Sequence, residues 1–206
     1  MNSKLRSKNV AKGKQIIGAA ITLFTEKGYA QTSMVEIAKQ ADVSKQTVYS
    51  HFGSKDELFS EAISQKCESS GLVDFSDLDI NDVYQTLISI GQRFFVMITS
   101  KEAIAVHRIC AFESRAYPQL SQLFFKAGPE RLTDELSRLF DKMNSKGLLS
   151  IDNTKHAASQ FLNMMKGEAW MRIEFNVTEQ LSQQEVAQYM QDSVKFFMRG
   201  YAPKSS

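Results

Sequence analysis

Residues 32–59 read TSMVEIAKQADVSKQTVYSHFGSKDELF, and this stretch decides the fold of the first part of the chain. Ser33 is followed three residues later by Glu36, the spacing of a capping box, in which each side chain bonds the other residue's backbone N–H at a helix start. Ser54 and Glu57 repeat the spacing. The stretch therefore predicts two helix starts, with room for another short helix between them.

That short helix begins after Ser44, which is a good N-cap residue. Val48 and Phe52 follow at positions four apart, so they are neighbours on one face of the helix. Asp42 is left in the turn that precedes the cap. Helix, tight turn and helix over about residues 34–53 make up a helix-turn-helix.

The polar residues of this short helix predict what it contacts. If Val48 and Phe52 point into a core, the side chains at the N-terminal end point outward, where free N–H groups and partial positive charge favour phosphate. In a helix-turn-helix the second helix lies in the major groove of DNA, with its N-terminal residues on base edges. There Lys45 can pair with guanine, Gln46 with adenine, and Thr47 can contact a thymine methyl group.

Backbone phosphates are the expected partners of the residues around this helix. Tyr49 and Lys55 suit that role, as do the hydroxyl groups of Thr32 and Ser33 at the preceding helix start. The competing interpretation is a solvated face on an ordinary small helical bundle.

The distribution of charge favours the DNA interpretation. Residues 1–55 hold nine lysine or arginine residues against three acids, and the other 151 residues hold 16 against 20, which gives net charges of +6 and −4. A basic small part joined to an acidic larger one predicts that the first meets a polyanion. Two interpretations stay open for the basic residues 1–10: a solvated end, or an arm that contacts phosphates or the minor groove.

Four motifs carry a family resemblance: F-x-x-K-G-Y from Phe24, T-S-M-x-x-I-A from Thr32, A-x-V-S-x-x-T-V-Y-x-H-F from Ala41 and K-x-E-L-F from Lys55. They resemble the DNA-binding domain of the TetR family of transcriptional regulators over nearly sixty residues in register. The resemblance implies a three-helix DNA-binding unit followed by a helical, dimeric, ligand-sensing domain. The family often has glycine in the turn where this chain has Asp42, a residue type that can adopt the left-handed conformation.

Double-stranded DNA, in the form of an operator, is thus the expected partner. The residues that match commonly DNA-contacting family positions, together with the serines that begin the two helices, form the expected contact set: Thr32, Ser33, Ser44, Lys45, Gln46, Thr47, Tyr49, His51 and Lys55.

The rest of the chain also reads as helices, so the expected fold is all-α, with a first helix over about 11–27. A loop follows the helix at 55–66, and further helices are predicted at 81–99, 101–113, from Pro118, from Pro129, at 153–175 and at 182–199. The segments FESRAYPQLSQLFFKAGPERLTDELSRLF and HAASQFLNMMKGE resemble the C-terminal domain of AefR-like TetR regulators. The expected organisation is a basic arm at 1–10, a DNA-binding domain at 11–71 and a helical regulatory and dimerisation domain at 81–202.

A pocket for a small apolar or amphipathic effector is implied by the family resemblance. Apolar and adaptable side chains suit such a site, and the candidates are Phe94, Met97, His107, Phe112, Phe124, Met164, Met165 and Trp170. The competing interpretation for each of them is ordinary core packing.

The last two helices are the candidate dimer interface, because they carry more apolar residues than one-sided packing requires. Two such helices from each subunit can form a four-helix interface about a twofold axis. The candidates are Phe161, Val186, Tyr189, Met190, Val194 and Phe197, with Met165 and Met198 beside them.

Several functions are disfavoured by the composition. Two cysteines and three histidines give little material for a metal site, so neither metal nor cofactor is expected, although a redox role for Cys110 stays open. No catalytic grouping or phosphate-binding glycine loop is visible, which argues against an enzyme. Basic residues followed by the apolar segment IIGAAITLF resemble the start of a signal peptide, but TEKGY follows that segment in place of a cleavage site. No stretch is long enough to span a membrane, so a cytoplasmic protein is expected.

The leading hypothesis is a ligand-responsive, dimeric repressor that a small molecule releases from a palindromic operator. An activator, or a regulator with no small-molecule effector, is the alternative. An architectural DNA binder would carry positive charge along the whole chain, unlike this one.

Overall fold

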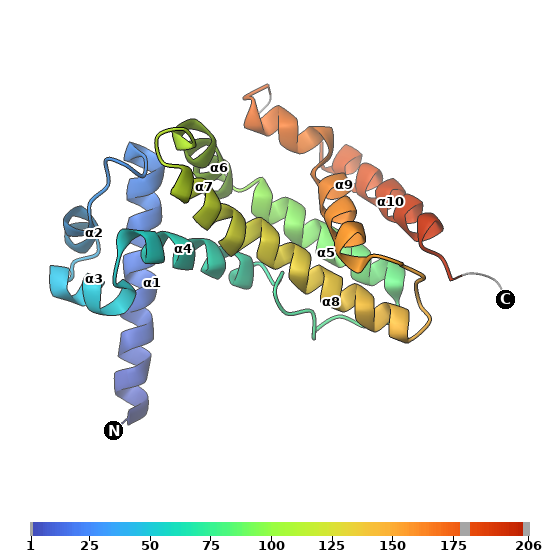
Figure 1. Cartoon of the computed structure of the whole chain (residues 1–206), viewed down its shortest axis with the longest axis horizontal. Helices are drawn as coiled ribbons and strands as arrows, with labels where there is room; N and C mark the ends of the chain where they lie inside the picture. The colour runs from blue at the N-terminus through green and yellow to red at the C-terminus, as the bar shows by residue number, and fades with distance from the viewer. Residues whose placement is uncertain (1, 178–181, 204–206) are drawn as a thin grey trace. The chain divides into compact units, whose positions relative to one another are not determined.

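A computed structural model describes residues 2–177 and 182–203, with side chains from Ala11 onward. Those residues form helices and no strand, which confirms the all-α prediction. The elements, in chain order, are α1 (Asn2–Lys27), α2 (Met34–Gln40), α3 (Lys45–Phe52), α4 (Lys55–Ser69), α5 (Val83–Ile98), α6 (Lys101–Glu113), α7 (Pro118–Phe125), the short π-helix η1 (Lys126–Glu130), α8 (Arg131–Ser145), α9 (Thr154–Glu174) and α10 (Gln183–Gly200) (Figure 1).

The chain forms two compact units. The first contains the residues up to Gln65 together with Ala105–Ala127, and the second contains Lys66–Ile104 and the residues from Gly128 onward. Residues 105–127, which the sequence places in the regulatory domain, therefore belong to the first unit. The reason is packing: Val106, Cys110 and Leu120 are buried in the same apolar cluster as α1 and α4.

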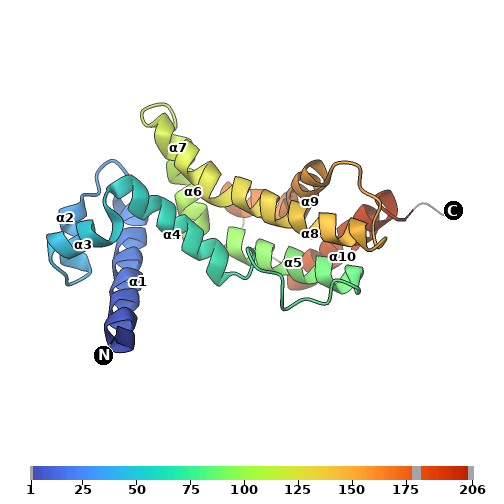
Figure 2. The same ribbon diagram turned by 60° about the horizontal axis from the view of Figure 1, so that its bottom comes forward.

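The core of the first unit is built around three aromatic rings. Phe24, Tyr29 and Phe59 contact one another with ring centroids 5.4–5.6 Å apart. Ile37 of α2 and Val48 of α3 are fully buried in the same cluster. Burial of these two residues holds α2 and α3 against α1, and α2 and α3 lie side by side in both views (Figure 1, Figure 2).

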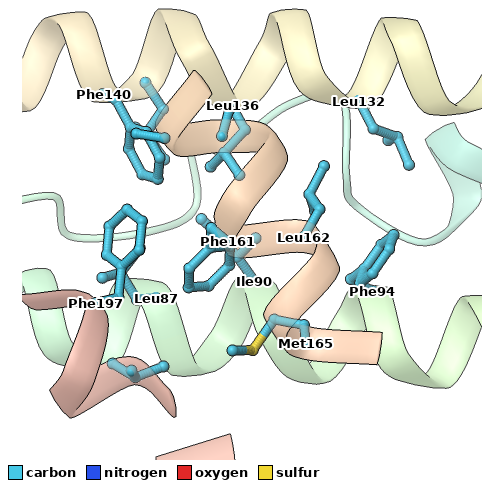
Figure 3. Close-up of a cluster of buried hydrophobic side chains, with 14 of the residues drawn as sticks. Leu87, Ile90, Phe94, Leu132, Leu136, Phe140, Phe161, Leu162, Met165 and Phe197 are labelled. Carbon is cyan, nitrogen blue, oxygen red and sulfur yellow. The ribbon is translucent and has the colours of Figure 1, made fainter. Parts of the chain in front are cut away.

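The second unit is a helical bundle with its own core. Leu132, Leu136 and Phe140 of α8 point towards Phe161 and Leu162 of α9 (Figure 3). Leu87, Ile90 and Phe94 of α5 and Phe197 of α10 complete the buried cluster. This core places α9 and α10 next to each other, which matters for the cleft described below.

Two helix boundaries differ from the sequence predictions. α1 begins at Asn2 rather than near Ala11, so the backbone of the expected arm continues the helix; its side-chain contacts lie outside the described residues. Pro129 does not begin a separate helix but lies inside the π-helix η1, which joins α7 to α8. Proline lacks an N–H and clashes with the carbonyl four residues before it, and the wider π-helical turn accommodates the ring without breaking the helical path.

Candidate nucleic-acid interface

The predicted helix-turn-helix is present, and both of its short helices are capped as expected. At the start of α2, Glu36 N donates to Ser33 Oγ (3.2 Å) and Ser33 N donates to Glu36 Oε2 (3.0 Å), which is the reciprocal capping box. At the start of α3, Thr47 N donates to Ser44 Oγ (3.1 Å). Asp42 has a φ of 47°, so the turn uses the left-handed conformation at the position where the family often has glycine.

One face of α3 is exposed and makes few contacts within the protein. Val48 is fully buried and Phe52 half-buried, which turns Lys45, Gln46 and Tyr49 outward. Tyr49 is 43% exposed, and the Lys45 ammonium lies 5.6 Å from the centre of its ring. Within the described part of the chain the Gln46 amide has no hydrogen-bond partner, so both its donor and its acceptor can bond a base edge.

The hydroxyl groups beside this face are already engaged. Ser33 donates its hydroxyl proton to Glu36 Oε2 (2.9 Å), and the Ser44 and Thr47 hydroxyls bond each other at 2.8 Å. The Ser33 proton is thus occupied, whereas one hydroxyl of the Ser44–Thr47 pair keeps a proton that it can donate to a phosphate. These three residues therefore position α2 and α3, and their expected contact with DNA remains a prediction.

His51 lies away from the exposed face. Its ring is half-buried, 5.8 Å from the ring centre of Phe52, and beside Gly13 of α1, where an added Cβ would lie 3.7 Å from His51 Nδ1. The position of the ring suits packing of α3 on α1.

Thr32 does not fit its expected role. Its side chain is 2% exposed, and its hydroxyl donates to the carbonyl of Gly28 (2.8 Å) and contacts that of Leu23 (3.2 Å). A buried, bonded hydroxyl cannot contact phosphate, so the prediction for the Thr32 hydroxyl is wrong.

Lys55 also bonds within the protein. Its Nζ donates to the carbonyl oxygens of Tyr29 (2.9 Å) and Thr32 (3.0 Å) and lies 4.2 Å from the centre of the Tyr29 ring. Burial lowers the pKa of Lys55, although the nearby carboxylates of Asp56 and Glu113 partly offset this effect. Lys55 therefore fastens the loop between α1 and α2 to the start of α4, a role that the sequence does not indicate.

A second set of contacts to this loop was not predicted at all. Glu113, at the end of α6, accepts from the backbone N–H groups of Tyr29 (3.1 Å) and Ala30 (3.2 Å). The Tyr29 hydroxyl donates to Asp56, and burial together with that bond raises the pKa of Tyr29. Glu113 is more than 80 residues from its partners, so no local sequence signal could have found it.

The expected effector-pocket residues are not brought together. Phe94, Met97 and Met165 are buried in the core of the second unit, with Met164 half-buried against it. His107 and Phe124 belong to the first unit, where their rings meet edge to face at 6.3 Å.

Phe112, also in the first unit, is 90% exposed, so its assignment to a pocket is wrong. The periodicity of these apolar positions could not say which face of each helix meets which neighbour.

A cleft of about 330 Å³ lies elsewhere in the second unit, between α5, α9 and α10. Of the expected pocket residues it includes Met165, and it also includes Val186, Tyr189 and Met190 from the expected dimer interface. Trp170 lies nearby, half-buried, with the Lys166 ammonium 5.1 Å from the centre of its ring.

Most of the expected dimer-interface residues are buried within their own subunit. Phe161, Val194 and Phe197 pack against one another and Phe140 in the core, and Met190 is also buried, so none of these four can form an interface between subunits. These assignments are wrong because the α9–α10 pair needs its apolar residues to cover α5 and α8.

The exposed apolar residues of α10 are different ones. Tyr189 is 47% exposed and Phe196 is 71% exposed. They are seven residues apart, which places them on the same face of the helix. The sequence analysis missed Phe196 because its spacing from the buried apolar residues of α10 does not show whether it is buried or exposed.

The metal-ligating side chains and the two cysteines can be located within the described residues. No three metal-ligating side chains gather within that part of the chain. Cys67 and Cys110 are both buried, and burial raises the pKa of Cys110 to about 12, which suppresses the reactive thiolate. Within residues 2–177 and 182–203, no helix has the length and apolarity that a bilayer crossing requires.

The capped helix-turn-helix with its exposed polar face defines a DNA-binding regulator, and comparison with known proteins gives the family. Residues 16–62 match the model of the tetR family of bacterial regulatory proteins, and residues 85–203 match that of the AefR-like transcriptional repressor C-terminal domain. The chain belongs to the TetR family, whose members are transcriptional regulators that bind DNA and act as dimers, and it is not an enzyme.

Individual relatives agree along most of the chain. The flavonoid-responsive regulator FrrA is 31% identical with a TM-score of 0.74, over 95% of this chain and 99% of that one. A TetR-family structure from Mesorhizobium loti is 27% identical with a TM-score of 0.78, over 94% and 98% of the two chains. The biofilm-operon negative regulator IcaR of Staphylococcus aureus is 27% identical, over 64% of this chain and 71% of IcaR.

Proposed function

We infer that this protein is a dimeric, sequence-specific repressor that a small molecule releases from a palindromic operator. The observation that carries this proposal is the exposed row of Lys45, Gln46 and Tyr49 at the N-terminal end of α3. A lysine and an unbonded amide at that place suit guanine and adenine edges in the major groove, and Tyr49 suits a phosphate.

A palindromic operator follows from the symmetry of a dimer, since each subunit presents one α3 to one half-site. The exposed Phe196 of α10 supports the dimer, because an exposed aromatic side chain on a helix face typically marks an interface between proteins.

Release by a small molecule is supported by two observations. The second unit contains a cleft whose volume reaches the lower end of the range of ligand sites. FrrA, which is similar over nearly the whole chain, is described as flavonoid-responsive, and IcaR is described as a negative regulator. A ligand acts as a switch only if it binds the DNA-free conformation more tightly than the DNA-bound one.

The test is selection of binding sequences from a random pool of duplex DNA by the purified protein at physiological salt. We expect a palindromic consensus with two half-sites about one helical turn apart or a multiple of it. Enrichment without any consensus would contradict sequence-specific reading and favour an architectural DNA binder.

The direction of regulation needs a second measurement. A reporter gene placed behind the selected operator should be silenced when the protein is expressed and restored in cells that supply the effector. Expression that rises with the protein would identify an activator instead.

A further inference from the structure

The walls of the cleft in the second unit combine apolar and charged side chains. Phe95 comes from α5, Met165 from α9, and Val186, Tyr189 and Met190 from α10. Such walls take up the apolar body of a small molecule, and the methionine side chains can adapt to its shape.

The charged side chains of the cleft are not equivalent. Arg172 and Glu168 pair with each other, with Nε and Oε1 2.8 Å apart. Glu185 is exposed and solvated by water. Lys166 is half-buried, and within the residues that the structure describes it makes no ion pair.

Among the charged side chains of the cleft, Lys166 would therefore be stabilised most by a ligand of opposite charge. Burial lowers the pKa of its ammonium, because a partly desolvated cation is less stable than one in water. A carboxylate at this position would restore the lost solvation through a charge-assisted hydrogen bond. Glu185 gains less from a cation, because water already solvates it.

The cleft also lies at a break in α9. Gly167 has a φ of 55° and a ψ of −171° inside the helix, and the Tyr189 hydroxyl donates to the carbonyl of Met164 at 3.0 Å, one turn before the break. A Cβ on Gly167 would lie 2.7 Å from the Tyr189 ring, so the ring occupies the space that glycine leaves. A molecule that packs against Tyr189 would touch the side chain that supports the break.

We propose that this cleft binds an amphipathic organic monocarboxylate, with the carboxylate on Lys166 and the apolar body between Phe95, Met165 and Tyr189. The assignment rests on the proposed function, since it names the chemical class of the effector. Binding there favours one geometry of the Gly167 break, which links occupancy of the cleft to the conformation of α9.

The test compares three probes that share one apolar body: 4-phenylbutyrate, 4-phenylbutan-1-ol and 4-phenylbutylamine. Calorimetric titration into the full-length protein should show the acid binding at least about tenfold more tightly than the alcohol, with the amine weakest, because one hydrogen bond to a charged group is worth that much. Binding that favours the amine, or no binding of any probe at millimolar concentration, would overturn the proposal.

Lys166→Met keeps an unbranched side chain and removes the charge. We expect it to reduce acid binding to the level of the alcohol and to leave alcohol binding unchanged. Lys195→Met is the matched control, since Lys195 is an exposed lysine of α10 near Asp192, and it should keep the acid preference. An equal loss in both variants would mean that the preference is a general charge effect and not a site.

Two further measurements test whether the probes bind in the cleft and whether a second copy of the chain covers it. Ala169→Leu, which adds bulk to the cleft lining, should weaken all three probes while circular dichroism stays unchanged; unaltered binding would place the probes elsewhere. Acid binding that weakens as the protein concentration rises would mean that a second copy of the chain covers the cleft, which also overturns the proposal.

Release of the protein from the selected operator is measured separately and tests the proposed function independently of the ligand site. Lys166-dependent binding of the acid without release of DNA would support the site and contradict release by this class of ligand. Release of DNA by a compound that does not need Lys166 would preserve the proposed function and overturn the site.

Discussion

The α2–α3 segment and the α9–α10 pair are both helix pairs with mixed polar and apolar residues, but their structures are determined over different distances. In α2 and α3 each capping side chain bonds a backbone N–H three residues away. In α9 and α10 the defining bond joins Tyr189 to the carbonyl of Met164, 25 residues earlier, across a helix break. Local bonds can be recognised in a sequence, whereas the second arrangement depends on how two helices meet.

Lysine side chains show the same contrast within one motif. Lys45 is exposed on α3, while Lys55, ten residues later, bonds two carbonyl oxygens of the loop before α2. Both match DNA-contacting family positions. Family position alone therefore does not separate a lysine whose side chain is exposed on α3 from one that bonds within the protein.

The largest expected effect separates core from interface in the α9–α10 pair. Phe161→Ala should lower the free energy of unfolding by about 3–5 kcal/mol, because it leaves a cavity in the core of the second unit. Phe196→Ala, on the exposed face of α10, should change it by less than about 0.5 kcal/mol within a fixed oligomeric state. Chemical denaturation at one protein concentration measures both.

Sedimentation completes that comparison. Phe196→Ala should shift the equilibrium towards monomer, as expected for an interface residue. A dimer as tight as the wild type would show that α10 meets its partner through another face.

The next effect concerns Lys55. Lys55→Met leaves the carbonyls of Tyr29 and Thr32 without their donor, and we expect it to cost about 1.5–3 kcal/mol of stability, the range for hydrogen bonds to a charged group. Lys45→Met is the matched control and should leave the thermal unfolding temperature nearly unchanged while weakening DNA binding. If Lys55→Met instead lowered the salt slope of DNA binding by about one and kept full stability, Lys55 would be a phosphate contact after all.

Recognition of the DNA base sequence should depend on Gln46 more than on Tyr49. Gln46→Ala should cost about 1–3 kcal/mol at one base position of the selected operator and flatten the preference there. Tyr49→Ala should weaken binding to all sequences alike, as loss of a phosphate contact does. Titration against a set of single-base operator variants measures both, and a uniform loss for Gln46→Ala would remove it from the base-reading set.

The cap of α2 should contribute about 1 kcal/mol. Ser33→Ala removes the acceptor of the Glu36 N–H, and helix N-cap substitutions of this kind typically cost that amount. Thermal unfolding checks it. A neutral result would show that water replaces the cap.

The smallest expected effect depends on pH. Hydrogen bonds from Lys27 and Ser33 lower the pKa of Glu36 from 4.5 to about 2, so the ionised carboxylate stabilises the folded state. That contribution is complete above about pH 4.5, declines below it and is absent below about pH 2. Glu36→Gln should therefore be slightly less stable than the wild type at pH 7, with the difference shrinking on acidification; a constant difference would point to lost packing.

The sequence by itself determined the all-α fold, the helix-turn-helix, the family and the exposed row on α3. The capping boxes and the spacing of Val48 and Phe52 depend on interactions between residues a few positions apart. The net charge of residues 1–55 is a sum over side chains. Both kinds of property can be obtained from the sequence without knowing the fold. Asp42 shows how reliable such local rules are, since it adopts the left-handed turn that its side chain permits.

Only the tertiary structure decided which side of each longer helix faces the core. Phe161, Val194 and Phe197 are buried, whereas Phe112 and Phe196 are exposed. Glu113 accepts a hydrogen bond from the loop at Tyr29, and Lys166 lies in a cleft beside the break at Gly167. An apolar residue at helical spacing is equally suited to a core, a pocket or a subunit interface. The choice among the three depends on the neighbouring helices, which lie far away in the sequence.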